Sequence, residues 1–131
     1  MKIRTGFVSN SSTSSFVIMG FTVPRGKFTR QYYLQNLYEV NTWEDEEDME
    51  DKYYDCVYNK AIRVADHEED GAPKGKTLIG VNVATWSNDD YTKAAEFDIA
   101  TMLGKAARAR DKLGLSEEEA PIKIFVGTRL S

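Results

Sequence analysis

The second half of the chain contains two β-prone segments with a helical pattern between them. This order restricts the possible folds more than any other feature of the sequence. Residues 77–86 are rich in branched and aromatic side chains, and residues 122–129 begin with alternating apolar and polar ones. A strand, helix, strand order predicts a right-handed crossover that places the two strands parallel in one sheet. The helix should pack on that sheet.

The helix between these segments has signals at both ends. Ser87 or Asn88 can cap its start, and Gly114 followed by Leu115 predicts a Schellman-type end. We expect its inner stripe to consist of Ala95, Ile99, Met102, Ala106 and Leu113. The small residues of this stripe permit close packing on a sheet.

The first half of the chain predicts a hairpin and two helices. Residues 3–8 and 16–21 are β-prone and flank the polar connection 9–15. Residues 29–40 carry apolar and aromatic side chains at helical spacing, and a second helix should start near Trp43 with Thr42 as its cap. Its predicted inner stripe is Met49, Tyr53, Cys56, Val57 and Ala61.

Together these segments predict one α+β domain over residues 1–131. The expected order is β-β-α-α-β-α-β, with a four-stranded mixed sheet and the helices packed on one of its faces. A length of 131 residues and a 41% hydrophobic content suit one core. No apolar run is long enough to predict a membrane span or a signal peptide, and the single Cys56 predicts no internal disulfide, so we expect a cytosolic protein.

The polar connection between the first two strands is the most unusual segment and our first candidate for partner binding. It consists of Ser9, Asn10, Ser11, Ser12, Thr13, Ser14 and Ser15. Its hydroxyls and amides could bind an anion, accept a modification or dock against a partner, whereas the simpler interpretation is a solvated linker. It lacks the Gly-Lys-Ser/Thr of a phosphate loop.

Acidic side chains are concentrated in two runs, residues 44–51 and 66–70, and the net charge is −4. This charge makes nucleic acid an improbable partner. Within the first run we select Glu46, Glu47 and Asp48 as candidates for contact with a basic protein surface. The run does not match a calcium loop, and a solvated helix start explains it more simply.

Tyrosines are numerous in the two predicted helices of the first half, and Tyr32 and Tyr33 are candidates for partner contact. Core packing is the simpler interpretation. His67 has no second histidine with which to form a zinc site, and Cys56 among apolar and aromatic neighbours reads as an inert thiol. No catalytic set stands out, so we expect neither an enzyme nor a cofactor.

The opening of the chain carries a resemblance. It reads Lys2-Ile3-Arg4-Thr5-Gly6-Phe7-Val8-Ser9-Asn10-Ser11-Ser12-Thr13-Ser14-Ser15-Phe16. This segment resembles the start of a group of small, mostly uncharacterised tailed-bacteriophage proteins, which begin with a similar Gly-Phe-Val-Ser-Asn followed by serines and Phe. Residues 126–129 are similar to the ends of some of them, and the middle of the chain is unmatched.

The resemblance implies a phage origin but brings no activity and no catalytic residues. Our first hypothesis is a non-enzymatic structural or accessory protein that binds other virion proteins in the capsid or tail, either as an assembly subunit or as a homo-oligomer. The alternative is a host-directed phage protein whose acidic surface binds and blocks a bacterial protein. Either function places the chain in the cytoplasm of the bacterial host, and the first also places it in the virion.

Overall fold

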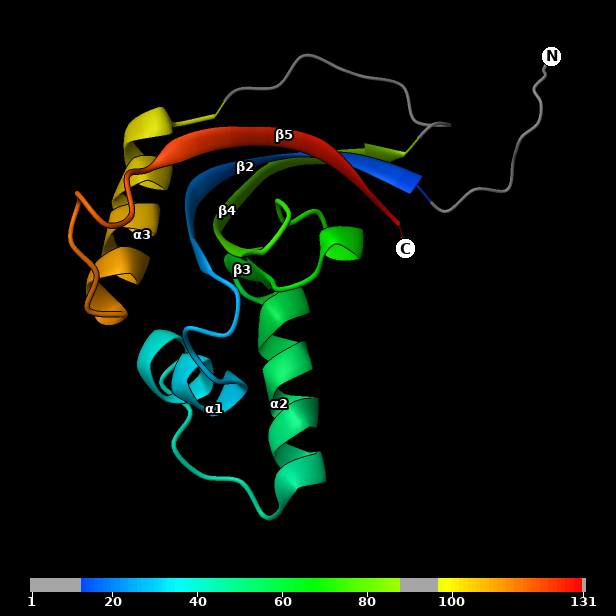
Figure 1. The fold of residues 1–131 in the computed structure, drawn as a ribbon, viewed down its shortest axis with the longest axis vertical. Coiled ribbons are helices and arrows are strands. Elements are labelled where there is room, and N and C mark those ends of the chain that lie inside the picture. The colour runs from blue at the N-terminus through cyan, green and yellow to red at the C-terminus, as the bar shows by residue number, and fades with distance from the viewer. Residues whose placement is uncertain (1–12, 88–96, 131) are drawn as a thin grey trace, which may run out of the picture.

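The computed structural model describes residues 13–87 and 97–130 as one α+β domain (Figure 1). In chain order its elements are β2 (Thr13–Pro24), α1 (Arg30–Tyr32), the π-helix η1 (Tyr33–Leu37), α2 (Glu46–Asn59), β3 (Ile62–Ala65), the 3-10 helix η2 (Glu68–Asp70), β4 (Lys76–Ser87), α3 (Ile99–Lys112) and β5 (Lys123–Leu130). The predicted element order was therefore wrong. A short strand, β3, follows α2, and the predicted strand 3–8 lies outside the described residues.

The sheet is antiparallel throughout, with the strand order β3-β4-β2-β5. The predicted mixed sheet was wrong. β4 and β5 run in the same direction, as their crossover through α3 predicts, but β2 lies between them and pairs antiparallel with both. The long β2 supplies a hydrogen-bonding edge to each of these strands, so they never become neighbours.

β2 also corrects the predicted hairpin. Thr13, Ser14 and Ser15 were predicted to lie in a loop, but they form the start of β2 and pair with Leu130, Arg129 and Thr128 of β5. Over residues 14–20 both edges of β2 are hydrogen-bonded, to β4 and to β5, which leaves no edge there for the partner strand that the sequence predicts. Ser9, Asn10, Ser11 and Ser12 lie outside the described residues.

The larger core lies between the helices and one face of the sheet. Phe21, Ile79 and Val64 contribute the sheet side, because alternate residues of each strand point to the same face. Leu34 of η1 and Leu113 after α3 are buried against them. Burying side chains of this kind contributes about 1.5–3 kcal/mol each, so this layer holds the helices on the sheet.

The opposite face is covered by the connection between β3 and β4, which contains the short 3-10 helix η2 and no α-helix. Phe16, Ile18 and Leu78 form a second buried cluster there with Ala65 and Ala72. In this cluster the Phe16 ring lies against Gly71 and Gly127, where a Cβ atom would meet the ring at about 2.5 and 3.1 Å. These two glycines therefore give the ring its space, and the ring anchors the connection to the sheet.

The helix starts differ from those predicted, whereas the end of α3 agrees. Asp45, not Thr42, caps α2, and Asp98, not Ser87 or Asn88, caps α3. Ser87 is instead the last residue of β4. At the end of α3, Gly114 has a φ of 74° and the Leu115 amide donates to the Arg110 carbonyl, which confirms the Schellman pattern.

The inner stripe of α2 was predicted well and that of α3 only in part. Met49, Tyr53, Cys56 and Val57 are all buried, while Ala61 lies beyond the end of the helix and is exposed. In α3, Ala106 is buried and Leu113 is buried just beyond the helix, but Ile99 is 65% exposed and Ala95 lies outside the described residues. Ala109 and Arg110, which were not in the predicted stripe, are also buried on the inner side of α3.

Candidate functional site

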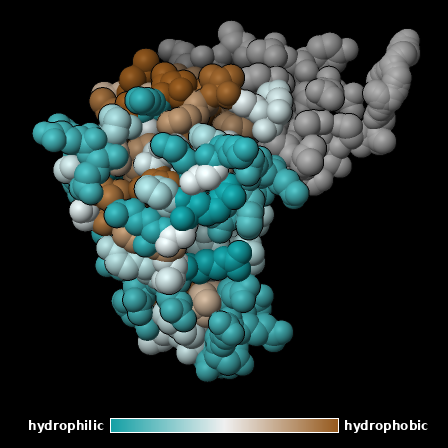
Figure 2. Space-filling model, viewed as in Figure 1, coloured by the Kyte–Doolittle hydropathy of each residue, from teal (hydrophilic) through white to brown (hydrophobic). Residues whose placement is uncertain are grey.

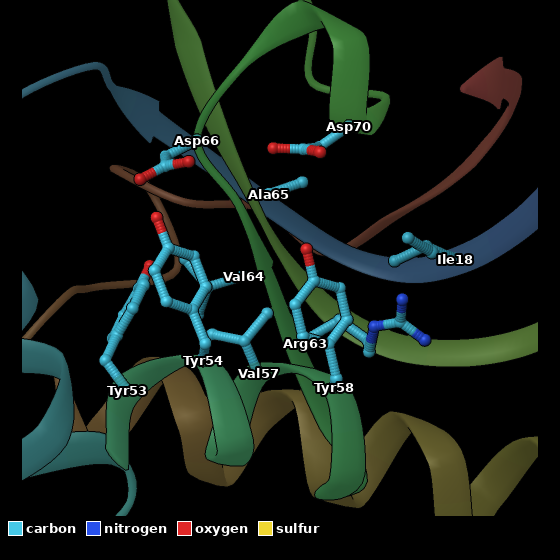
Figure 3. Close-up of a pocket in the computed structure, with 10 residues that line it drawn as sticks. All are labelled: Ile18, Tyr53, Tyr54, Val57, Tyr58, Arg63, Val64, Ala65, Asp66 and Asp70. Atoms are coloured by element: carbon cyan, nitrogen blue, oxygen red, sulfur yellow. The ribbon is translucent and has the colours of Figure 1, made fainter. Parts of the chain in front are cut away.

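A cleft lies between α2 and the segment that runs from β3 through η2 (Figure 3). We call it the tyrosine cleft; it encloses about 120 Å³. Its lining residues are Ile18, Tyr53, Tyr54, Val57, Tyr58, Arg63, Val64, Ala65, Asp66 and Asp70. Binding sites for small molecules commonly enclose about 300–1,000 Å³, so this cleft suits a single chemical group rather than a whole cofactor.

Two tyrosine rings form the outer wall of the cleft. Tyr54 and Tyr58 are one helical turn apart on α2, so their side chains lie on the same face of the helix. The ring centroids are 6.3 Å apart with planes at 17°, and the side chains are 40% and 59% exposed. Tyr53 lies edge-on to Tyr54, with 5.5 Å between ring centroids, and is itself buried.

Two arginines of the protein already lie on these rings. The Arg30 guanidinium is 5.0 Å from the Tyr54 ring centroid and 5.4 Å from that of Tyr53. The Arg63 guanidinium is 5.8 Å from the Tyr58 ring centroid. These distances fall within the roughly 6 Å over which a cation is attracted to an aromatic face. The rings of the wall therefore make cation–π contacts with two arginines of the same chain.

Two carboxylates lie across the cleft from the tyrosine rings. Asp66 follows β3 directly and Asp70 ends η2, and Figure 3 shows both carboxylates above the hydroxyl ends of Tyr54 and Tyr58. The Asp66 carboxylate is 3.9 Å from the Arg30 guanidinium, which makes a shorter contact of 2.9 Å with Glu50. Within the described residues, the Asp70 side chain has no ion pair or hydrogen bond.

Tyr53, one of the residues that line the cleft, has an unusual buried hydroxyl. Tyr53 is 2% exposed, and its hydroxyl has no hydrogen-bonding partner among the described residues. Burial, and next the negative charge of Asp66, raises the pKa of Tyr53 well above its usual value. Tyr33 has its pKa raised by the same two causes, in the same order. Both phenols therefore stay neutral near neutral pH.

Cys56 and His67, the two other side chains that the sequence analysis considered, do not line the tyrosine cleft. The Cys56 thiol is buried, and burial raises its pKa, which opposes formation of the thiolate nucleophile. His67 is exposed, with its Nε2 atom 3.9 Å from an Asp66 carboxylate oxygen. Within residues 13–87 and 97–130, no group of three or more potential ligands is placed to hold a metal ion.

A second feature is an apolar surface at another part of the molecule. We call it the β5–α3 surface; its residues are Phe97, Ile99, Leu103, Ile124 and Val126, with exposed fractions from 46% to 71%. Ile124 and Val126 alternate along β5 and share one face of it. Figure 2 shows apolar side chains gathered at the end of the molecule where Figure 1 places β5 and the start of α3.

The candidate residues from the sequence lie in three separate places. Tyr33 is buried in the core, and Tyr32 is partly buried, stacks on Phe28 and donates from its hydroxyl to the Leu113 carbonyl. Glu46 and Glu47 are exposed in the first turn of α2.

In that same turn, Asp48 accepts a hydrogen bond from the Glu44 amide, and this bond lowers its pKa. Thr13, Ser14 and Ser15 begin β2. The start of α2 lies at the opposite end of the molecule from β2 (Figure 1). The structure therefore does not bring these candidates together.

Sequence reasoning missed both the tyrosine cleft and the β5–α3 surface. Tyr54 and Tyr58 are four residues apart and fall outside the predicted inner stripe of α2, which was a signal for an exposed aromatic pair. No sequence signal showed that residues 66–70 fold back over these rings. Ile124 and Val126 were read only as part of the last strand, because alternation in a strand leaves the burial of each face undecided.

Comparison with known proteins adds no relationship, because no family model, no curated protein and no solved structure matches this chain. Among the described residues, no helix combines the length and the apolar character that crossing a bilayer requires.

Proposed function

We propose that this chain is a non-enzymatic bacteriophage structural or accessory protein that binds another virion protein through the β5–α3 surface. The observation that carries the proposal is the exposure of large apolar side chains on two elements at one end of the molecule. Contiguous exposed apolar patches commonly mark interaction sites in folded proteins. A partner that covers these side chains would remove their apolar surface from water, which favours the bound state.

β5 adds backbone hydrogen-bonding capacity to this surface. In the described sheet β5 is the last strand, with β2 as its neighbour, so no described strand pairs with the amides and carbonyls of its outer edge. Exposed edges of this kind accept an additional strand from a partner in several recognition modes. A partner that pairs with β5 would also cover Ile124 and Val126.

The alternative, a host-directed protein that acts through an acidic surface, is supported by a different observation. Glu46, Glu47, Glu68 and Glu69 are exposed, and the chain carries a net charge of −4. Acidic surfaces guide association with basic partners mainly by raising the rate of encounter. This function requires no contact through the β5–α3 surface.

Mass spectrometry of purified particles of the phage that encodes this chain separates the two functions. Peptides of this chain at fixed stoichiometry are expected if it is a virion protein. Absence from particles, together with co-purification with one bacterial protein from infected cells, would instead favour the host-directed function.

A pair of variants tests the surface itself. Val126→Glu places a charge in the β5–α3 surface, whereas Gln31→Glu adds the same charge at an exposed position of α1. We expect Val126→Glu to abolish incorporation into particles and Gln31→Glu to leave it unchanged, with both proteins folded by circular dichroism. Equal incorporation of the two variants would remove the β5–α3 surface from the proposal.

A further inference from the structure

We infer that the tyrosine cleft is a binding site for one cationic side chain, lysine or arginine, presented by a partner protein. The inference concerns a different site from the β5–α3 surface and does not depend on which protein covers that surface. It rests on the ring faces, the charge balance, the buried hydroxyl and the size of the cleft.

The rings supply the first part of the argument. Tyr54 and Tyr58 are exposed and nearly parallel, and each already has an arginine of this chain within 6 Å of its centroid. Aromatic rings attract cations through their quadrupole, and the attraction strengthens when the cation loses water. The exposed area that remains on both rings is therefore suited to a further cation.

The charge balance supplies the second part. Asp66 and Asp70 face the cleft, whereas Arg63 is its one basic lining residue. Arg30 makes its shortest ion pair with Glu50, at 2.9 Å, and is also 3.9 Å from Asp66. Asp70 has no ion pair among the described residues, so it is the carboxylate that a singly charged group would balance.

The buried Tyr53 hydroxyl supplies the third part. It is buried without a partner among the described residues, and the Tyr53 side chain is one of those that line the cleft. An unpaired buried hydroxyl carries a desolvation cost that a hydrogen bond removes. An ammonium or guanidinium group in the cleft carries several N–H donors for the two carboxylates, and it would reach the hydroxyl oxygen after a side-chain movement that uncovers this atom.

The size of the cleft selects a side chain over other cations. A volume of about 120 Å³ holds the head of one lysine or arginine but not a nucleotide or a larger cofactor. The tyrosine rings give a wall of aromatic carbon that hard metal ions do not use as a ligand. A long, amphipathic side chain matches both the ring faces and the carboxylates.

Titration of the isotope-labelled full chain with short peptides, followed by NMR, tests the inference. The probes are acetylated and amidated Gly-Gly-Arg-Gly-Gly and Gly-Gly-Lys-Gly-Gly, with a citrulline peptide as the uncharged equivalent of the first. We expect saturable shifts of the Tyr54, Tyr58 and Asp70 resonances with the two cationic peptides alone. Shifts that are equal for citrulline, or that centre on the acidic start of α2, would overturn the inference.

Three variants sharpen this test. Asp70→Asn should weaken binding of the arginine peptide about fivefold, since it removes one carboxylate from the cleft. Tyr58→Leu should weaken it about two- to fivefold. Glu69→Gln makes the same charge change as Asp70→Asn at an exposed neighbour that does not line the cleft, and should leave binding unchanged. Equal weakening by Glu69→Gln would show that only the general acidity of the segment matters.

Failure of this inference is distinguishable from failure of the proposed function. Val126→Glu should bind the arginine peptide as the unmodified chain does, because Val126 does not line the cleft. If the peptides do not bind while Val126→Glu still abolishes incorporation into particles, the cleft inference alone is wrong.

Discussion

Arg110 lies on the inner side of α3 and is 7% exposed, which is unusual for a guanidinium. Its Nη1 atom donates to the Ala120 carbonyl at 3.1 Å, and its Nη2 atom is 3.5 Å from the exposed Glu117 carboxylate. Arg110 therefore connects α3 to the segment that leads into β5.

Replacing Arg110 should therefore lower the free energy of unfolding more than replacing Arg108 in the same helix. Arg110→Ala removes the donor to the Ala120 carbonyl and the packing of the side chain, and we expect the free energy of unfolding to fall by about 2 kcal/mol. Arg108→Ala, at an exposed position of the same helix, should change it by less than about 0.5 kcal/mol. Urea unfolding of both variants measures the difference, and equal losses would contradict this role for Arg110.

Replacement by phenylalanine should change the free energy of unfolding differently at Tyr53 and at Tyr38. The Tyr38 hydroxyl donates to the Ile62 carbonyl at 2.7 Å, whereas the Tyr53 hydroxyl has no partner among the described residues. Tyr38→Phe should lower the free energy of unfolding by about 1 kcal/mol, and Tyr53→Phe should leave it unchanged or raise it by up to about 1 kcal/mol. Thermal unfolding of the two variants under one condition is the measurement. A large loss in Tyr53→Phe would reveal a partner for this hydroxyl.

At the scale of elements, the periodicity of apolar residues predicted the features that depend on residues close together in the chain. The stripe of α2 is buried as expected, because residues three and four apart share a helix face. The helix starts were misplaced because several residues in each region can cap, and the sequence does not rank them. β3 was missed because it has four residues, too few for a clear alternation, and only its pairing with β4 makes it a strand.

The cap of α3 predicts a dependence of stability on pH. Asp98 accepts hydrogen bonds from the Thr101 hydroxyl and amide, and these bonds lower the pKa of Asp98 below its usual value. A carboxyl group whose pKa is lower in the folded state stabilises the fold above its unfolded pKa. That contribution is lost as the pH falls through the folded pKa.

We therefore expect Asp98→Ala to unfold at a lower temperature than the unmodified chain at pH 7, and the difference to shrink below about pH 4. Thermal unfolding from pH 7 to pH 2.5 gives the comparison. A difference that is constant over this range would mean that the Asp98 charge does not stabilise the helix start.

At the scale of the whole molecule, the pairing of strands is what the sequence left undetermined. Most of β2, β4 and β5 was readable from local composition, but the order β3-β4-β2-β5 depends on contacts between residues far apart in the chain. The crossover through α3 suggested adjacent parallel strands, and nothing local showed that β2 would occupy the place between them. The tyrosine cleft was hidden for the same reason, since it forms only where residues 66–70 fold back over α2.

The central pair of the sheet makes the last prediction. β2 and β4 pair over most of their length, and Gly20 and Gly80 lie opposite each other in this register. A Cβ atom at Gly20 would overlap the backbone of Ile79 and Gly80, which cannot move without breaking the ladder. Gly20→Ala should therefore lower the free energy of unfolding by about 3 kcal/mol or more.

The matched control is Gly104→Ala in α3, where the added methyl group would have one neighbour, the Arg108 side chain, at 3.7 Å. Here the same substitution should raise the free energy of unfolding by up to about 1 kcal/mol, because alanine favours the helix over the unfolded chain. Opposite signs in urea unfolding would show that the close approach of β2 and β4, and not the loss of glycine as such, limits these positions. A mild effect of Gly20→Ala would contradict the close approach of the β2 and β4 backbones at this position.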